Sequence, residues 1–392
     1  MDRYSLRAIL TPAGQAALQV ASALRPRESD YLSCLQQLSR AVPEWLARPA
    51  LEIAILRGEA VGKFPFADRL YLTREALEQA SPWEVARYRA ERYRPFDRLA
   101  DLGCSVGGDA LALAEIAPVV GVDIDLLRLG MAQANLEALG LGERAVFINA
   151  DLNSDLPFNL GRRAALFFDP ARRAGGRRLR SVRHYLPSLE VVKNWLEGYP
   201  AIGVKISPGV ELDELRGYQA EIEFISLAGE LKEAALWFGP LRTARRRATI
   251  LPGGYSLTEE VEELLALGEP RAYLYEPDAA VLRAGLVAEL GAKLEAIQLD
   301  ADIAYLTSDR LTPTPFARAW QVVDWFPFNL KKLRAYLQER GIGKVTVKKR
   351  GSPLQPEDLI RRLRLKGEGE RVVFLTHLQG KPIVIIALPL SP

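Results

Sequence analysis

A glycine-rich turn between a strand and a helix is the first feature of this sequence that could bind a small molecule. The segment ADLGCSVGGDALALA spans residues 100–114. Asp101 ends the expected strand, and Gly103, Gly107 and Gly108 line the turn, where glycine lets the backbone approach a ligand at positive φ. The helix N-terminus that follows favours a carboxylate or phosphate. The spacing matches neither the dinucleotide pattern G-x-G-x-x-G nor a P-loop.

Three more aspartates stand where the next three expected strands end. VVGVDID places Asp123 there, 22 residues after Asp101, while INADL places Asp151 and AALFFDPARR places Asp169. With the glycine turn, this order resembles motif I and the strand-end acids of the class I S-adenosylmethionine methyltransferases. The resemblance implies that Asp123 accepts hydrogen bonds from both ribose hydroxyls of that cofactor, and that Asp151 receives its adenine amino group.

S-adenosylmethionine is therefore the cofactor that the resemblance implies. Its expected binding residues are Asp101, Gly103, Ser105, Gly107, Asp123 and Asp151. Each acid taken alone has a simpler alternative: Asp101 could cap loop amides, and Asp123 could be an ordinary exposed strand end. Asn153 and Asp155 lie close enough to Asp151 to replace it. Four acids in the family's order favour the cofactor interpretation.

The chemistry is expected at Asp169-Pro170-Ala171-Arg172. Methyltransferases that act on amino groups end the fourth strand in [DNS]-P-P-[YFW]. A planar amine must be held there by an acidic side chain and a backbone carbonyl, which offset the positive charge that develops on nitrogen. Asp169 and Pro170 match and are the expected catalytic residues. Ala171 replaces the second proline and Arg172 the aromatic residue, although an arginine can stack on a base or contact phosphate.

Carbon methylation is the alternative reaction. The sequence D-P-P-R is typical of the pyrimidine C5 methyltransferases of RNA, which the motif here also resembles. Those enzymes need a cysteine nucleophile near the base. Cys104 lies in the glycine turn and Cys34 in the N-terminal helical region, so carbon methylation ranks below amine methylation.

Two wider resemblances indicate RNA as the partner. LYLTREALEQA, DLGCSVGGDAL and FDPARRAGG follow one another as in guanine-N2 methyltransferases of the trimethylguanosine synthase type. Over nearly the whole chain, KFPFADRLYLTREALEQAS, DPARR, VKISPG, GELKE and VKKRG resemble a bacterial family of predicted methyltransferases with a THUMP-like C-terminal domain. A THUMP-type domain implies structured RNA, often transfer RNA; ribosomal RNA is the other candidate.

Arginine is concentrated where a phosphate backbone would be expected. The chain has 40 Arg against 12 Lys, and residues 172–184 carry six Arg and no acid directly after the catalytic motif. An arginine-rich loop at the mouth of the site suits phosphate contacts. The expected substrate-binding residues are Arg172, Arg173, Arg177, Arg178 and, on a neighbouring strand end, Lys205. Residues 331–366 add twelve basic residues against three acidic ones, for which a solvated helix face is a serious alternative.

Several other side chains have two interpretations. Lys205 either touches substrate or pairs with a carboxylate. Glu230, Lys232 and Glu233 either approach the site from between the last two strands or form a surface charge cluster, and the surface cluster is the expectation. Lys63 could belong to a lid over the site, whereas core packing is the expectation for the neighbouring phenylalanines at positions 64 and 66.

Composition excludes several classes of protein. Apolar residues make up 48% and charged residues 26% of the chain, a globular balance. Two cysteines and two histidines exclude a disulfide framework and a Cys/His zinc cluster, so we expect no metal. No apolar run approaches the roughly 18 residues of a membrane span, and the N-terminus lacks a secretory pattern. We therefore expect a cytoplasmic protein with no membrane partner.

The elements that must position these residues follow from periodicity. Apolar residues at three- and four-residue spacing predict helices in residues 1–95, with a helix start at Thr73 and a break at Pro82. From residue 98 onward, short apolar runs alternate with helical periods. This predicts an α/β fold with a doubly wound, mainly parallel, Rossmann-like sheet, whose ligands bind at the carboxyl ends of the strands.

The remaining chain predicts a small α/β domain. Helices are expected at residues 329–341 and 357–367, a strand at 343–351, and a terminal hairpin that turns near Gln379 and Gly380. The expected domains are a helical region (1–95), a methyltransferase domain (96–240), a mixed connecting region (241–318) and a THUMP-like domain (319–392). The favoured function is methylation of a base amine in RNA. The alternatives are a degenerate RNA-binding protein that retains cofactor binding, and a methyltransferase of small molecules or proteins.

Overall fold

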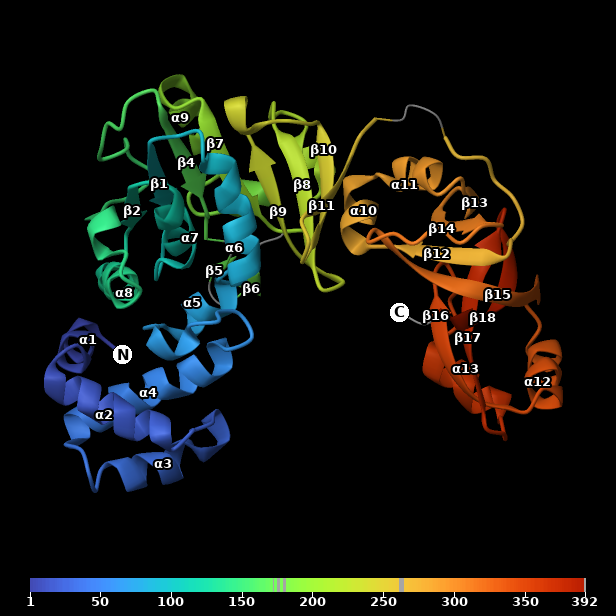
Figure 1. Ribbon diagram of the computed structural model, residues 1–392, viewed down its shortest axis with the longest axis horizontal. Helices are drawn as coiled ribbons and strands as arrows, with labels where there is room; N and C mark the ends of the chain where they lie inside the picture. The colour runs from blue at the N-terminus through green and yellow to red at the C-terminus, as the bar shows by residue number, and fades with distance from the viewer. Residues whose placement is uncertain (172, 175–176, 179–180, 261–263, 391–392) are drawn as a thin grey trace. The chain divides into compact units, whose positions relative to one another are not determined.

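The computed structural model describes residues 1–171, 173–174, 177–178, 181–260 and 264–390 (Figure 1), with the backbone alone for 173–174 and 177–178. Its contacts divide the chain into two compact units. The first unit contains Met1–Ile222 and Lys232–Thr243, and the second contains Glu223–Leu231 and Ala244–Pro392. No helix in the described ranges is long and apolar enough to cross a membrane.

The N-terminal part of the first unit is helical, as its periodicity predicts. Its α-helices are α1 (Arg3–Ile9), α2 (Pro12–Ala23), α3 (Tyr31–Leu38), α4 (Glu44–Ala60), α5 (Arg74–Gln79) and α6 (Trp83–Ala90). Helix α4 buries one small or aliphatic residue after another, because α1 and α2 pack against it. Thr73 caps α5 by accepting a hydrogen bond from Ala76 N at 3.1 Å, and Pro82 stands at the start of α6. Both predicted boundaries are confirmed.

A largely parallel sheet follows these helices. Its strands in this unit hydrogen-bond in the order β9-β7-β4-β1-β2-β3, where β9 alone among them is antiparallel to its neighbour β7. The bounds are β1 (Arg98–Leu102), β2 (Val119–Asp123), β3 (Ala145–Asn149), β4 (Ala164–Phe168), β7 (Ala201–Ile206) and β9 (Glu230–Trp237). All five residues of β4 are buried, as expected for a parallel strand covered on both faces. The predicted fold class is confirmed.

Helices α7 (Gly108–Ile116), α8 (Leu126–Ala138) and α9 (Val191–Gly198) connect these strands. Strand β1 lies between β2 and β4, so the chain proceeds to one side of β1 first and then to the other. This reversal opens a crevice at the carboxyl ends of the strands, where such sheets bind ligands. The N-terminal helices α5 and α6 precede β1 directly and pack near this edge (Figure 1).

The second unit contains two groups of strands. The first group is β8 (Glu221–Leu227), of which this unit holds the residues from Glu223 onward, with β10 (Arg246–Leu251) and β11 (Tyr255–Thr258). The second is a sheet in the order β13-β14-β12-β15-β18-β17-β16. Its strands are β12 (Tyr273–Pro277), β13 (Ile297–Asp300), β14 (Ile303–Ser308), β15 (Ala317–Pro327), β16 (Ile342–Lys349), β17 (Gly369–Leu378) and β18 (Lys381–Pro389).

Helices α10 (Ala279–Ala284), α11 (Val287–Lys293), α12 (Leu330–Glu339) and α13 (Pro356–Leu363) complete this unit. Leu333, Leu359 and Val373 belong to a core between α12, α13 and the sheet. The predicted terminal hairpin is confirmed. Leu378 pairs with Lys381, and Gln379 and Gly380 both have positive φ, at 48° and 79°, as a two-residue turn requires.

Candidate active site

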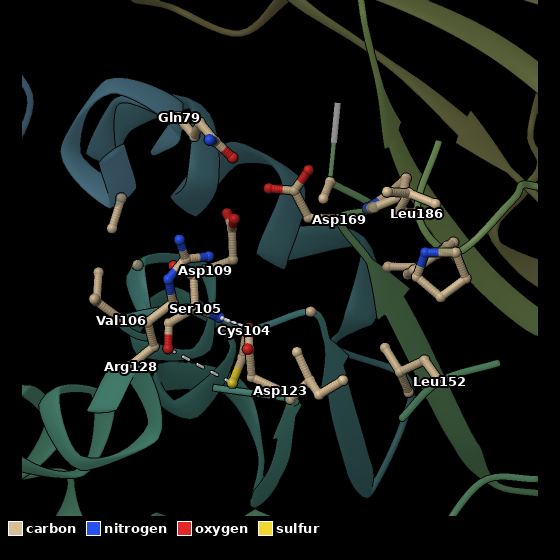
Figure 2. A pocket seen from close by; sticks show the side chains of 18 of the residues that line it. Gln79, Cys104, Ser105, Val106, Asp109, Asp123, Arg128, Leu152, Asp169 and Leu186 are labelled. Carbon is tan, nitrogen blue, oxygen red and sulfur yellow. Dashed lines mark hydrogen bonds between the residues drawn. The ribbon is translucent and has the colours of Figure 1, made fainter. Parts of the chain in front are cut away.

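A cavity of about 250 Å³ opens at the carboxyl ends of β1, β2, β3 and β4 (Figure 2). Asp123 and Cys104 lie toward one end of it, and Asp169 and Gln79 toward the other; these are called the Asp123 end and the Asp169 end below. The cavity is lined by Ala76, Gln79, Ala80, Gly103, Cys104, Ser105, Val106, Gly108, Asp109, Asp123, Ile124, Arg128, Ala150, Asp151, Leu152, Asn153, Phe168, Asp169, Pro170, Ala171, Leu186 and Pro187.

The glycine turn after β1 is fixed by backbone contacts on both sides. Gly103 N and Cys104 N donate to the carbonyl of Val122 at 2.8 and 3.0 Å, which attaches the turn to the end of β2. Gly103 has φ +78°, and a Cβ at this position would lie 2.6 Å from the carbonyl oxygen of Asp169. No other residue type fits so close to the loop after β4. Gly107, at φ +82°, is the N-cap of α7.

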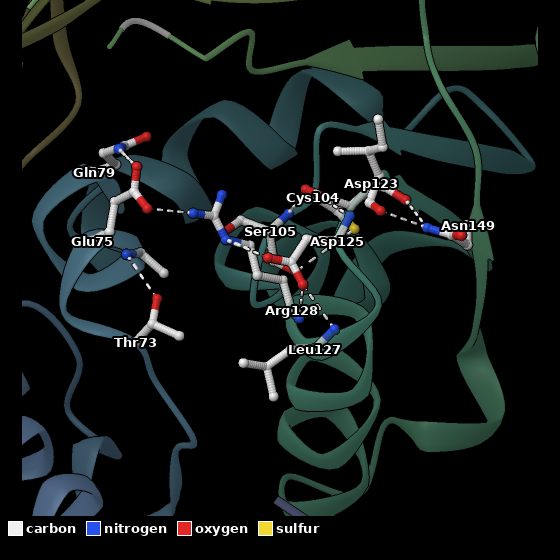
Figure 3. A network of polar contacts seen from close by, with 12 residues as sticks. Thr73, Glu75, Gln79, Cys104, Ser105, Asp123, Asp125, Leu127, Arg128 and Asn149 are labelled. Atoms are coloured by element: carbon white, nitrogen blue, oxygen red, sulfur yellow. Dashed lines mark hydrogen bonds and ion pairs between the residues drawn. The ribbon is translucent and has the colours of Figure 1, made fainter. Parts of the chain in front are cut away.

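Asp123 is fixed by two backbone amides. Its Oδ2 accepts from Ser105 N and its Oδ1 from Asp125 N, both at 2.9 Å (Figure 3). Burial raises the pKa of the carboxyl, and the two amides oppose that rise. Each carboxylate oxygen can accept more than one hydrogen bond, so Asp123 keeps acceptor capacity toward the cavity. Ser105 itself has φ +50°, an unusual conformation for a residue with a side chain.

Asp101 lies deeper than the sequence analysis placed it. Its side chain is fully buried and is not among the lining residues, and neither carboxyl oxygen has a hydrogen-bond partner in the structure. Burial raises its pKa well above the ordinary value, and the nearby Asp109 and Asp169 raise it further. A cationic ligand bound above this buried carboxyl would favour its charged form and lower its pKa.

Asp151 and Asn153 both line the cavity after β3. Asp151 is exposed, and its Oδ1 accepts from Asn153 N at 2.9 Å and from Asn153 Nδ2 at 2.8 Å. Asp155, the other alternative at this strand end, is exposed and is not among the lining residues. Asp151 and Asn153 are therefore joined by hydrogen bonds. The sequence alone does not show which of the two side chains would serve as acceptor or donor to a ligand.

Asp169, Pro170 and Ala171 line the opposite end of the cavity. Asp169 N donates to the carbonyl of Leu102 at 3.0 Å, which keeps the loop after β4 beside the end of β1. Asp169 Oδ2 accepts a hydrogen bond from Lys205 Nζ at 2.7 Å. Ala171 forms a bridge with Leu186 through hydrogen bonds of 2.9 and 3.1 Å, so the segment around Leu186 closes this end.

The arginine loop is described only in part. Arg173 belongs to β5 (Arg173–Ala174), while Arg177 and Arg178 form β6 (Arg177–Arg178), and these short strands pair antiparallel. Arg172 lies outside the described residues. The substrate contacts expected for these four arginines stay predictions. Of the two interpretations of Lys205, the structure shows the pairing with a carboxylate.

Gln79 and Arg128 are among the lining residues that the sequence did not indicate. Gln79 belongs to α5, and Arg128 to α8. Arg128 Nη2 donates to Glu75 Oε2 at 2.6 Å, and Gln79 Nε2 donates to Glu75 Oε1 at 3.2 Å (Figure 3). The helical period and the Thr73 cap predict α5 itself. No local pattern predicts that α5 contacts Arg128 and so covers the Asp123 end of the cavity.

A buried charge cluster lies under the Asp169 end, which corrects one expectation. Arg89, with 2% of its side chain exposed, forms ion pairs of 2.6 Å with both Asp109 and Glu233. Burial alone would lower the pKa of Arg89, but Asp109 and Glu233 more than offset this effect. Ser81 Oγ also contacts Arg89 and Glu233, at 2.8 and 2.9 Å. Glu233 was expected on the surface; that expectation is wrong, because β9 carries it inside the unit.

Lys63 and its neighbours pack rather than form a lid. Lys63 Nζ donates to the carbonyls of Leu77 and Ala80 at 2.6 and 3.0 Å, and so caps the C-terminal end of α5. The expected core packing of Phe64 is confirmed by its burial, and Phe66 packs edge-on against Trp83.

Cys104 lines the cavity, but its environment does not favour a nucleophile. Burial raises the pKa of the Cys104 thiol well above its ordinary value, and Asp101 and Asp123 raise it further. The thiolate is the reactive form of cysteine. Across the described residues, no group of three or more His, Cys, Asp or Glu side chains could hold a metal ion.

Comparisons with known proteins agree with this architecture. The family model described as "THUMP domain-like" matches residues 317–389, and a domain of unknown function, DUF8688, matches residues 2–60. The chain superposes on a crystal structure of a proposed methyltransferase from Porphyromonas gingivalis W83, with a TM-score of 0.80, 20% identity and full coverage of both chains. The fold is therefore that of a class I methyltransferase with a THUMP-like C-terminal region.

Two curated relatives come from Mycobacterium tuberculosis. They are the uncharacterized S-adenosylmethionine-dependent methyltransferases Rv3037c of strain H37Rv and MT3122 of strain CDC 1551. Each is 36% identical over 341 residues, which cover 84% of this chain and 92% of the relative. The chain belongs to this family of S-adenosylmethionine-dependent methyltransferases, and S-adenosylmethionine is its cofactor.

Proposed function

We propose that this protein transfers the methyl group of S-adenosylmethionine to a base amine in structured RNA, either transfer or ribosomal RNA. The observation that carries the proposal is that Asp169 and Pro170 line the same cavity as the glycine turn and Asp123. An acceptor and a methyl donor bound at the two ends would meet inside one cavity. Bringing the two reactants together in a fixed orientation supplies much of the rate of such a transfer.

The residues at the Asp123 end fit the cofactor. We assign its binding to the six residues expected from the sequence. Gly103, Ser105, Asp123 and Asp151 line the cavity and would contact the cofactor, whereas Asp101 and Gly107 lie outside the lining and would support the turn. The glycine turn leaves backbone open to the cavity, Asp123 retains acceptor capacity for hydroxyl groups, and the carboxyl of Asp101 lies buried without a partner beneath the turn. When bound, the cofactor supplies an electrophilic methyl group on a positively charged sulfur.

Asp169 and Pro170 are assigned to the methyl acceptor. The side chain of Asp169 is 20% exposed, and only its Oδ2 is taken by Lys205, so Oδ1 can accept an N–H of the amine. The carbonyl of Pro170 would accept the second N–H. These two acceptors hold the amine in place and offset the charge that develops on nitrogen. The raised pKa of Cys104 disfavours the alternative, carbon methylation through a thiolate.

RNA as the substrate rests on the THUMP-like match and on basic residues. In the first unit these are Arg172, Arg173, Arg177 and Arg178, which follow the catalytic motif directly. In the second unit Lys348 pairs with Glu276 and Arg361 with Asp358, which weakens their claim to phosphate. Exposed basic residues at the end of α13 are the stronger candidates there: Arg362, Arg364 and Lys366 are described without ion pairs or hydrogen bonds from their side chains.

The test is the transfer of labelled methyl from S-adenosylmethionine to total RNA of a strain that lacks this gene. We expect label in RNA with the wild-type protein, none with Asp169→Ala, and unchanged labelling with Asp155→Ala, which alters an exposed acid outside the cavity. Nucleoside digestion then identifies the modified atom. Absence of label with intact cofactor binding would overturn the proposal in favour of a degenerate RNA-binding protein or of a substrate that is not RNA.

A further inference from the structure

We propose that Lys205 is a positioning residue for methyl transfer, which acts by orienting Asp169 and by joining α5 to the acceptor site. The inference rests on the proposed function, since it assigns Asp169 to the acceptor. This positioning role takes the place of the direct contact between Lys205 and substrate that was one of the two expectations from the sequence. The burial of Lys205, its two hydrogen bonds and the charges around it support this role.

Lys205 is placed where substrate cannot reach it. It lies in β7, which is the strand next to β4. All six residues of β7 are buried, and 2% of the Lys205 side chain is exposed. It is also absent from the residues that line the cavity. A buried ammonium is stable only when it is paired and hydrogen-bonded, and its partners therefore define its role.

The ammonium has two partners, one in the loop after β4 and one at the end of α5. Nζ donates to Asp169 Oδ2 at 2.7 Å and to the backbone carbonyl of Gln79 at 3.2 Å. The first bond fixes which carboxylate oxygen remains free toward the cavity. The second attaches the last residue of α5, whose side chain lines the same end of the cavity as Asp169 (Figure 2). Lys205 thus holds the catalytic acid and the N-terminal helices in one arrangement.

The surrounding charges make this cation hard to replace. Asp101, Asp109 and Asp169 repel one another closely enough for the last two to raise the pKa of Asp101, whereas Arg89 and Lys205 lower it. Arg89 is already paired with Asp109 and Glu233. Without Lys205, Asp169 would lose its own cation and would be free to turn away from the two neighbouring acids.

Lys63 provides a matched control. Its ammonium caps the same end of α5, through the carbonyls of Leu77, Glu78 and Ala80, but it makes no contact with Asp169. Lys63→Met therefore removes a half-buried lysine that anchors α5 and leaves the acceptor acid untouched. A role of Lys205 in anchoring the helix alone would make the two variants behave alike.

The experiment compares wild type, Lys205→Met and Lys63→Met in RNA methylation and in calorimetric binding of S-adenosylmethionine. We expect Lys205→Met to lower kcat by about 100-fold, the scale of a misplacement of about 1 Å, while KM for RNA and Kd for the cofactor change less than about threefold. Lys63→Met should lower kcat less than about fivefold. If Lys205→Met does not fold, Lys205→Gln, which keeps a donor, takes its place.

Three results would overturn the inference. Equal losses in the two lysine variants would mean that the lysine only anchors α5. A raised KM for RNA at constant kcat would mean direct substrate contact. Crystal structures of wild type and Lys205→Met with an unmoved Asp169 carboxylate would exclude positioning. This last readout needs no substrate, so if the wild-type protein methylates no RNA, the proposed function fails while the role of Lys205 is still decided.

Discussion

At the Asp123 end of the cavity, backbone groups hold the functional atoms, whereas at the Asp169 end side chains from distant segments do. Asp123 is held by the amides of Ser105 and Asp125, 18 and 2 residues away. Asp169 is held by Lys205, which also reaches Gln79, 126 residues earlier in the chain. Below it, Ser81 contacts Glu233 across 152 residues. The first end is local and the second depends on long-range packing.

The two ends of the cavity should therefore respond differently to substitution. A site held by its own loop fails when a residue of that loop changes, and the rest of the unit is unaffected. A site held by buried ion pairs fails together with the fold, because removal of one partner leaves an uncompensated charge in the interior. The three substitutions below separate these two cases.

The largest expected effect is on the buried cluster under the Asp169 end. Arg89→Met leaves Asp109 and Glu233 without their shared cation, and breaking a buried pair in this way costs about 3–5 kcal/mol. We expect the free energy of unfolding, measured by urea titration, to fall by that amount. Arg87→Met is the control: its ion pair with Glu115 is 57% and 41% exposed, and such pairs contribute less than about 1 kcal/mol. Equal losses in both variants would contradict the comparison.

An intermediate effect is expected at the Asp123 end, confined to the cofactor. Asp123→Asn removes the charge and turns one acceptor into a donor that faces a backbone amide. Hydrogen bonds to charged groups contribute about 1.5–3 kcal/mol, so we expect Kd for S-adenosylmethionine to rise about 10- to 100-fold in calorimetry. At saturating cofactor, kcat should stay within about twofold. A large loss of kcat there would show that the two ends are not independent.

The smallest effect is expected for the pair that joins α5 to α8. Glu75→Gln weakens the ion pair with Arg128. The side chains of Glu75 and Arg128 are 57% and 24% exposed (Figure 3), and exposed ion pairs contribute less than about 1 kcal/mol to stability. We expect the dissociation rate of S-adenosylmethionine, measured by stopped flow, to rise no more than about fivefold. Glu59→Gln, whose partner Arg74 lies outside the cavity lining, should leave that rate unchanged. A similar rate in both variants would exclude a role of the Glu75–Arg128 pair in retaining the cofactor.

The features that depend on local order follow from the amino-acid sequence alone. Strands β1 to β4, the turn at Gly103 and Gly107, and the positions of Asp123 and Asp169 at strand ends follow from short apolar runs and from the glycines between them. The cap at Thr73 and the two-residue turn at Gln379 and Gly380 follow from the same kind of signal. Each of these is decided by a few neighbouring residues, whose periodicity and backbone preferences are written in the chain.

The pairing of the buried charges, in contrast, depends on the tertiary structure. Lys205 and Glu233 are strand residues with no local signal for a partner, and Glu233 looked like part of a surface cluster. The order β9-β7-β4-β1 brings Lys205 to Asp169, and the packing of α6 brings Arg89 to Glu233. The physical reason is that periodicity assigns a residue to a strand or a helix, whereas the neighbour of that strand depends on how the whole sheet buries its surface. The Asp123 end could thus be read from sequence, and the support of the Asp169 end could not.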